Sequence, residues 1–328
     1  MNCTLRRRTA LRRVATATVA VALGLSLSAC GGIDRAVAED GGPVSVKVGI
    51  IPIIDVAPLY LGVEQGFFEE ENLEVEMESG QGGAAIVPGV LSEQYQFGFS
   101  NTASLLLSVS KGQGLQAVAA GAATTGESGE DFGAVVVPED SRIKDAADLE
   151  GKRVAVNTLQ NINTLTINQA VRAGGGDPST IEYVELPFPD IAPAVAAGDV
   201  DAGQVVEPFV TVAEQQGNRQ VTSNFAAADP LLMVGLYFTS DRYAQQHPEV
   251  VAAFTRAMEK SLAHARRDPE KARAILDEYT DIAPEVQKNI VLPDWPEKIG
   301  IGSVKRLALL MAKDGITESP PDTAKLLP

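Results

Sequence analysis

Short apolar runs alternate with longer stretches of helical periodicity from Val44 onward. The runs have the length of strands, and the stretches between them place apolar residues three and four positions apart. Alternation of this kind is typical of parallel strands joined by crossover helices, so it predicts an α/β fold. The first series predicts strands at 46–51, 73–77 and 97–99, each followed by a helix, at 57–65, 84–92 and 102–111.

The same alternation resumes after Pro138 and predicts a second α/β unit. Strands are expected at 153–156, 181–186 and 202–206, and helices at 163–173, 190–197 and 208–216. The apolar run 231–239 is long for one strand and suits a strand that crosses back from the second lobe to the first. Beyond His247 only helices are predicted, at 248–267, 269–278, 284–290 and 303–312, and we expect them on the outside of the first lobe. This assigns 44–137 and 236–328 to lobe 1, and 138–235 to lobe 2.

The first 29 residues have the composition of an export signal. Five arginines precede an apolar run from Val14 to Leu27, and the segment contains no acidic residue. The run is shorter than a membrane-spanning helix prefers, so a cleaved signal is favoured over a retained span. It ends in Leu-Ser-Ala-Cys-Gly at 27–31, which resembles the lipobox of bacterial lipoproteins and predicts lipidation of Cys30. The alternative is an ordinary cleavage site with an incidental cysteine.

Residues 30–43 are rich in Gly, Asp, Glu and Ala without apolar periodicity, and we expect a flexible tether there. The only cysteines are Cys3 and Cys30, so the folded body has no disulfide, thiol nucleophile or thiolate metal cluster, and we expect no cofactor and no metal. Removing the signal leaves 22 of the 27 basic residues and all 43 acidic ones, a net charge of −21. Such a surface repels nucleic acid and anionic lipid headgroups, so neither is an expected ligand.

Five polar or glycine-rich turns separate a predicted strand from the helix that follows it. Ligands of open α/β sheets bind at such junctions, beyond the carboxyl ends of the strands. In the first turn Asp55 is either a helix cap, the simpler interpretation, or a ligand contact. The second, Ser-Gly-Gln-Gly-Gly at 79–83, lets the backbone approach a ligand or is simply a mobile turn. The third contains Asn101, for which capping and solute binding are equally open.

The fourth and fifth turns are more polar than a connecting loop requires. Residues 157–164 carry six uncharged polar side chains, where an ordinary surface loop would include lysine or glutamate. In the fifth turn Pro208 suits the first position of a helix. Glu207 before it either complements the helix dipole or accepts hydrogen bonds from a cationic or NH-bearing ligand. Both interpretations of Glu207 stay open.

An ordered set of these segments resembles the NMT1/SsuA/TauA-like periplasmic binding proteins. The set comprises Val-Gly-Ile-Ile-Pro at 48–52, Pro-Leu-Tyr-Leu-Gly-Val-Glu-Gln-Gly-Phe-Phe at 58–68, Leu-Glu-Val-Glu at 73–76, the glycine loop from Gly80, Asp-Leu-Glu-Gly-Lys-Arg-Val-Ala-Val at 148–156, Ala-Ala-Gly-Asp-Val-Asp-Ala at 196–202 and Glu207-Pro208. The resemblance implies a type II periplasmic-binding-protein fold, with two α/β lobes joined by a hinge and a helical C-terminal segment. Carried over by position, it implies a pocket formed by Asp55, Gln81, Gly82, Asn101, Thr158, Asn161, Asn163 and Glu207.

The lipobox implies a lipid-anchored protein at the outer face of the cytoplasmic membrane, and we expect a monomer. The family resemblance implies a solute-binding protein. It would bind a small organic solute, of the sulfonate, taurine or organic acid class, and deliver it to the permease and ATPase of an ABC importer. A pyrimidine precursor of thiamine is an alternative solute. None of the pocket loops contains arginine or lysine, which argues against a strongly anionic ligand such as nitrate.

Three other functions compete with solute transport. A pyrimidine synthase on the same fold would need histidine and cysteine chemistry, yet His247 and His264 both lie in the helical C-terminal part. We therefore expect a protein without enzymatic activity. A transcription regulator would need a basic DNA-binding segment, and the one basic cluster lies in the export signal. A sensor subunit would share the pocket, and adjacent genes for an ATPase and a permease would distinguish transport from sensing.

Overall fold

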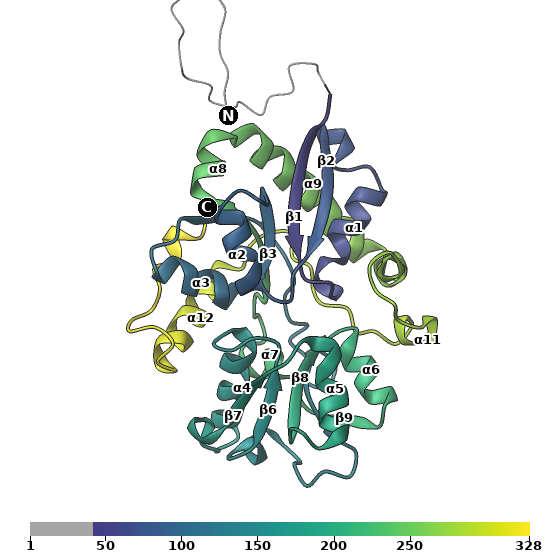
Figure 1. The fold of residues 1–328 in the computed structure, drawn as a ribbon, viewed down its shortest axis with the longest axis vertical. Coiled ribbons are helices and arrows are strands. Elements are labelled where there is room, and N and C mark those ends of the chain that lie inside the picture. The colour runs from purple at the N-terminus through teal and green to yellow at the C-terminus, as the bar shows by residue number, and fades with distance from the viewer. Residues whose placement is uncertain (1–41) are drawn as a thin grey trace, which may run out of the picture. The chain divides into compact units, whose positions relative to one another are not determined.

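The computed structural model describes residues 42–328 (Figure 1). The expected signal peptide, most of the tether and Cys30 lie outside the described residues. The strands are β1 Val44–Ile50, β2 Leu73–Ser79, β3 Phe97–Asn101, β4 Leu115–Ala120, β5 Gly133–Pro138, β6 Arg153–Val156, β7 Glu182–Glu185, β8 Ala202–Val206, β9 Asn218–Thr222 and β10 Gly235–Ser240. The helices are α1 Ala57–Glu64, α2 Gly83–Leu91, α3 Thr102–Ser110, α4 Ile162–Ala173, α5 Phe188–Ala197, α6 Phe209–Gln215, α7 Asn224–Ala228, α8 Asp241–Gln246, α9 Pro248–Arg267, α10 Pro269–Ala274, α11 Pro284–Gln287 and α12 Ile301–Lys313.

The first sheet has the strand order β2-β1-β3-β10-β4. Its β1 is parallel to β2 and β3, as the alternating pattern predicts, whereas β10 runs antiparallel to β3 and β4. On one side, the long helix α9 packs against α1 and β4. Phe254 of α9 is fully buried, and its ring stacks on that of Phe97 in β3 with centroids 3.9 Å apart. The apolar side chains on one face of α9, Phe254 among them, pack on the first lobe and hold the helix there.

The second sheet has the order β7-β6-β8-β5-β9. Here β6 is parallel to β7 and β8, and β5 is antiparallel to β8 and β9. The sequence pattern misses β5 as a member of this sheet and places the start of lobe 2 at residue 138, but the sheet already includes Gly133. The apolar run 133–137 carries no turn signal that would assign it to either lobe. The fold therefore has two similar five-stranded sheets, and each of them contains both parallel and antiparallel strand pairs.

Two chain segments connect the sheets, one between β4 and β5 and one between α7 and β10. The sequence pattern predicts one strand over 231–239, but the strand begins at Gly235. The residues before it pair instead with the first connecting segment: Thr124 donates its backbone N–H to Leu232, and Val234 donates to Ala122. A third segment joins them, because Ala123 and Asp294 exchange two backbone hydrogen bonds, of 2.8 and 3.0 Å. We call the segments 121–132, 223–234 and 292–295 the hinge.

The C-terminal helices lie mainly on the first lobe, with one extension to the second. Helix α12 contacts α3 of the first lobe and also α4 of the second. Just after α12, the carboxylate of Asp314 is paired with the guanidinium of Arg172 and accepts a hydrogen bond from Asn168, both on α4. We expect these helices on the outside of the first lobe, and the contacts of α12 and Asp314 with α4 reach the second lobe as well. Within residues 42–328, no helix is long and apolar enough to cross a membrane.

Candidate functional site

Residues from both sheets line one buried chamber. From the first lobe come Ile51, Ile53 and Asp55 after β1, and Phe99 and Asn101 on β3. The second lobe and the hinge supply Asn157, Asn161, Ile162, Asn163, Phe188, Val206, Phe225 and Val234. Most of these residues lie at or just beyond the carboxyl ends of β1, β3, β6 and β8 or begin the helix that follows. Phe188 begins α5 after β7, Phe225 lies in α7, and Val234 directly precedes β10. The chamber has a volume of about 30 Å³, which is the space of one water molecule. We call it the inner chamber.

A larger hollow adjoins the inner chamber and shares Ile51, Ile53 and Phe188 with it. Its volume is about 230 Å³. The rest of its lining consists of Pro52, Ser79, Gly80, Gln81, Pro187, Pro189 and Phe209. The rings of Phe188 and Phe209 stack with centroids 6.0 Å apart. This outer pocket is therefore mostly apolar, and it too is formed by both lobes.

Asp55 is the charged residue of the inner chamber. It lies inside the short 3₁₀ helix Ile54–Val56, and the N-cap positions of that helix and of α1 are Ile53 and Val56. The interpretation of Asp55 as a helix cap is therefore wrong. The side chain is 2 % exposed, and its Oδ2 accepts no hydrogen bond from any residue in the described range 42–328. Burial raises the pKa of Asp55 to about 7, and the nearby charge of Asp131 adds to the shift.

The polar run after β6 forms a network of side-chain amides at the start of α4. Asn161 caps the helix, because its Oδ1 accepts hydrogen bonds from the backbone of Asn163 and Thr164. Its Nδ2 donates to Oδ1 of Asn157 at 2.9 Å and to Oγ1 of Thr158 at 2.8 Å. Nδ2 of Asn163 donates to the same Asn157 oxygen at 2.8 Å. The network holds three asparagines against the chamber, and it explains why this loop is polar without being charged.

Asn101 and Gly82 occupy the corresponding helix starts in the first lobe. Asn101 lines the chamber and also caps α3, so the two interpretations of this residue are compatible. Gly82 is the N-cap position of α2, and a Cβ placed there would lie 2.8 Å from Cγ2 of Thr158 in the second lobe. Only glycine permits this close approach of the two lobes. Gln81 is exposed and lines the outer pocket, whereas Thr158 is half-buried and lines neither hollow.

Glu207 lies outside both hollows and connects three parts of the chain. Its carboxylate accepts hydrogen bonds from the backbone and hydroxyl of Thr211 at 3.1 and 2.8 Å, and from the backbone N–H of Val291 at 3.1 Å. Its carbonyl accepts from the N–H of Ile54 in the first lobe at 3.0 Å. Burial raises the pKa of Glu207 to about 7. The residue therefore binds the lobes to each other and to the C-terminal segment.

The sequence pattern does not single out most of the apolar residues that line the inner chamber and the outer pocket. Asn157 belongs to the polar run that it recognised, but it was not among the eight residues that the resemblance implies. Phe99, Phe188, Phe209 and Phe225 belong to strand ends and helix starts whose apolar character looks like ordinary core. The one available signal was position, since Phe188 and Phe209 each begin a helix directly after a proline.

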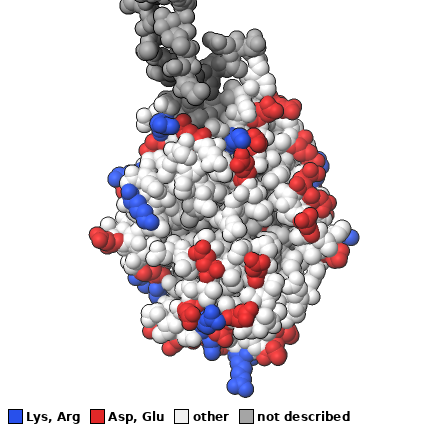
Figure 2. Space-filling view, in the orientation of Figure 1, with Lys and Arg blue, Asp and Glu red and all other residues white. Residues whose placement is uncertain are grey.

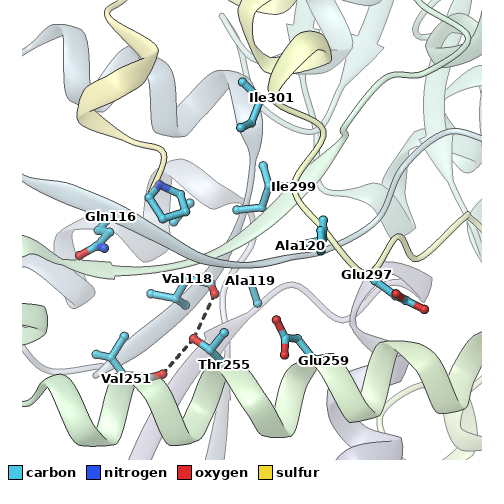
Figure 3. Close-up of a pocket in the computed structure, with 13 residues that line it drawn as sticks. Gln116, Val118, Ala119, Ala120, Val251, Thr255, Glu259, Glu297, Ile299 and Ile301 are labelled. Carbon is cyan, nitrogen blue, oxygen red and sulfur yellow. Dashed lines mark hydrogen bonds between the residues drawn. The ribbon is translucent and has the colours of Figure 1, made fainter.

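A third hollow, of about 420 Å³, lies on the first lobe away from these strand ends (Figure 3). It runs along the edge strand β4 and the helix α9, and Pro328 contributes to its wall. Thr255 hydrogen-bonds the carbonyls of Val118 and Val251 there, as the dashed lines in Figure 3 show. None of its lining residues comes from the second sheet. Movement of one lobe against the other would leave this hollow unchanged.

Two α/β lobes, two connecting segments and a site at facing strand ends define the class of two-lobed periplasmic-binding-protein-like folds. The chain belongs to the NMT1/THI5 like family, whose model matches residues 53–272. The alkanesulfonate-binding protein SsuA from Xanthomonas axonopodis pv. citri, solved with bound MOPS, has the same fold, with a TM-score of 0.72 at 17 % identity over 87 % of this chain and 98 % of that one.

Two relatives in this comparison have different activities. The taurine-binding periplasmic protein of Escherichia coli is 27 % identical over 58 % of this chain and 57 % of its own length. The 4-amino-5-hydroxymethyl-2-methylpyrimidine phosphate synthase of Aspergillus parasiticus is 25 % identical over 70 % of this chain and 67 % of its own. Similarity therefore covers both binding proteins and an enzyme, and the choice between them depends on the site.

Proposed function

We propose that this chain is the extracytoplasmic solute-binding protein of an ABC importer and that it captures a small organic solute between its two lobes. The observation that carries the proposal is that both sheets direct their strand ends at one chamber and one outer pocket. A solute placed there contacts both lobes only when they are closed. It therefore shifts the protein towards the closed form, which then docks on the permease of the importer.

The hinge suits this motion. Two chain segments connect the lobes, and residues 292–295 pair with the first of them. Contacts across the site include the Gly82 to Thr158 approach, the hydrogen bonds of Glu207 with Ile54 and Val291, and the contacts of Asp314 with Arg172 and Asn168. The inner chamber of about 30 Å³ is too small for a whole organic solute. Entry of a solute into the chamber therefore requires the lobes to separate, and binding is completed when they close again.

We propose that the protein acts as a monomer and that its location follows from the N-terminal segment. The export signal and the lipobox cysteine support anchoring at the outer face of the cytoplasmic membrane. A Cys30→Ser variant is expected to move from the membrane fraction to the soluble extracytoplasmic fraction, because it has no thiol to lipidate. Continued sedimentation of the variant with membranes would contradict a lipid anchor at this residue.

The surface charge agrees with a solute-binding role better than with nucleic-acid binding. Figure 2 shows acidic side chains scattered over the visible face, with basic ones interspersed among them. Such a surface does not attract polyanions. We therefore retain the sequence-based interpretation of a small-molecule partner.

A pyrimidine synthase is the second candidate, because relatives with that activity share the family. Its chemistry would require reactive side chains in the site. The residues that line the inner chamber and the outer pocket, all within the described range, include no histidine and no cysteine. His247 contacts Tyr243 and His264 contacts Phe67, both in the first lobe outside these hollows. We therefore propose a binding protein without enzymatic activity.

A substitution that holds the lobes apart tests whether the solute is captured when the lobes close. In the closed structure a Cβ at residue 82 already lies 2.8 Å from Thr158, so Gly82→Val is expected to hold the lobes apart. A panel of taurine, isethionate, phenethylamine, phenethyl alcohol, benzoate and nitrate is titrated while the melting temperature is followed. We expect at least one compound to stabilise the wild type, and Gly82→Val to weaken its binding by about tenfold or more, since contacts to one lobe are lost.

The matched control is Gly42→Val, because a Cβ at Gly42 meets no atom within 4 Å. This variant is expected to bind the same compound as tightly as the wild type does. Equal affinity of Gly82→Val and wild type would show that the solute does not require the closed lobes, and the proposal would fail.

A further inference from the structure

The inner chamber contains a buried negative group without a partner. Oδ2 of Asp55 accepts no hydrogen bond from residues 42–328. Burying a carboxylate oxygen in this way costs free energy unless something donates to it. The other buried aspartate nearby differs in this respect, because Asp131 accepts from Thr124, Thr125, Phe132 and Ala226. Oδ2 of Asp55 is therefore the unpaired acceptor of a buried carboxylate, and a donor on a ligand would offset the free-energy cost of burying it.

The amide groups that line the chamber with Asp55 already have acceptors, and the buried hydroxyl of Tyr237, whose pKa the charge of Asp55 helps to raise, makes no hydrogen bond to it. The Nδ2 groups of Asn161 and Asn163 already donate to Asn157, and Nδ2 of Asn101 donates to Ser104. The described residues that line the chamber and the outer pocket include no lysine and no arginine. The local charge of the site is therefore negative. A negative, donor-poor site favours a cation and disfavours an anion.

The sizes of the two hollows suit a solute that has a small polar head and a larger apolar body. The inner chamber, at about 30 Å³, has room for a group the size of water or ammonium next to Asp55. The outer pocket, at about 230 Å³, is lined by Phe188, Phe209 and three prolines and has room for a short chain or a ring. Because the hollows share Ile51, Ile53 and Phe188, one molecule can occupy both when the lobes close around it.

We propose that the solute carries an ammonium or amidinium head, which donates its N–H groups to Asp55 in the inner chamber, with its body in the outer pocket. The proposal rests on the proposed function and narrows its solute class. Within the sulfonate class it selects compounds that also bear an amine, such as taurine. It excludes nitrate, plain sulfonates and carboxylates without an amine as the physiological solute.

Matched pairs of compounds test the head group directly. Taurine and isethionate differ only in ammonium against hydroxyl, and phenethylamine and phenethyl alcohol differ in the same way. We expect the ammonium member of at least one pair to bind the wild type about tenfold more tightly than its hydroxyl partner, because the ammonium adds the attraction of an opposite charge to the hydrogen bond with the buried carboxylate. In Asp55→Asn this preference is expected to disappear, whereas Asp140→Asn, which removes an exposed carboxylate, is expected to keep it.

The outcomes separate this proposal from the proposed function. If isethionate or benzoate binds as tightly as the ammonium compounds and Gly82→Val abolishes that binding, capture between the lobes stands and the cationic head is wrong. If an ammonium compound binds but Asp55→Asn binds it equally well, Asp55 is not its partner. If neither ammonium compound shifts the melting temperature of the wild type, the assignment of the head group is also overturned. The melting transition of Asp55→Asn shows in the same experiment that the variant is folded.

Discussion

Asp55→Asn is expected to make the solute-free protein more stable at about pH 8, by up to about 4 kcal/mol in the free energy of unfolding. Burial raises the pKa of Asp55 from 3.8 to about 7 in the folded protein. Below about pH 4 the group is protonated in both the folded and the unfolded protein, so its titration costs nothing. As the pH rises from about 4 to 7 the unfolded protein releases this proton and the folded protein retains it, so stability falls. Above about pH 7 the loss is complete.

The groups around Asp55 give no compensation for its charge. Asp131 is negative, and the pKa values of the buried Tyr237 and the half-buried Tyr60 and Tyr279 are raised by burial, with the charge of Asp55 contributing for Tyr237 and Tyr279. No cation faces Asp55 from the described elements that form the chamber. Chemical unfolding at about pH 5 and pH 8 checks the prediction. The difference in stability between wild type and Asp55→Asn should be small at the lower pH and large at the higher one.

Glu207 also contributes to the pH dependence of stability in this experiment. Its pKa is also raised to about 7 by burial, so part of the loss of stability with rising pH should remain in Asp55→Asn. The exposed Asp140→Asn variant should follow the wild type throughout. A constant difference between wild type and Asp55→Asn across the pH range would show that Asp55 is not buried as a charge in the solute-free protein. Asp55 would then cost no stability, and no cationic partner would be needed to offset its charge.

Asp131→Ala is expected to destabilise the protein by about 3 kcal/mol or more, because several buried donors lose their acceptor at once. The Asp131 carboxylate is fully buried and joins the first two segments of the hinge. One oxygen accepts from the backbone of Thr125 and Phe132, and the other accepts from the hydroxyl of Thr124 and the backbone of Ala226 in α7. Burial raises the pKa of Asp131, and these hydrogen bonds oppose that shift. Alanine would leave all of these donors without a partner.

Hydrogen exchange distinguishes a hinge effect from a general loss of stability. In Asp131→Ala the amides of Phe132 and Ala226 should exchange faster by more than the amides in the middle of β1 and β6. Asp140→Ala, with an exposed side chain, is expected to change stability by less than about 0.5 kcal/mol. If Asp131→Ala unfolded at the same denaturant concentration as wild type, the hydrogen bonds of Asp131 would contribute nothing to the hinge.

The elements that the sequence predicts well are those whose residues pack regularly. The strands β6 and β8 and the helix α9 occupy the predicted ranges, because short apolar runs and a long amphipathic pattern leave little choice of register. The strands β4, β5 and β9 were not predicted. In β4 the sequence Leu-Gln-Ala-Val-Ala-Ala has weak strand propensity, and its pairing with β10 comes from a partner more than a hundred residues away in the chain.

The candidate site could be located from sequence more easily than it could be interpreted. Asp55, Asn101, Asn161 and Asn163 do line the inner chamber, since turns at the ends of parallel strands gather in space. Whether Asp55 caps a helix depends on one turn of 3₁₀ helix, which no periodicity reveals. Glu207 carries the same chemical signal as Asp55, but its acceptors are already used by Thr211 and Val291. Which side chains find hydrogen-bond partners depends on how the chain packs, and this cannot be predicted from the local sequence.

Capture of a solute between the lobes is tested most directly by a reversible lock. A Cβ at residue 82 would lie 2.8 Å from Cγ2 of Thr158, which places it within about 4.3 Å of the Cβ of that residue, inside the range that a disulfide spans. The melting temperature of a Gly82→Cys, Thr158→Cys double variant is measured with and without the panel compounds, before and after reduction. The two single variants control for the cysteines at positions 3 and 30. The account predicts that a compound stabilises the reduced form and has no effect on the oxidised form, whose lobes cannot open. Equal stabilisation of both forms would contradict it.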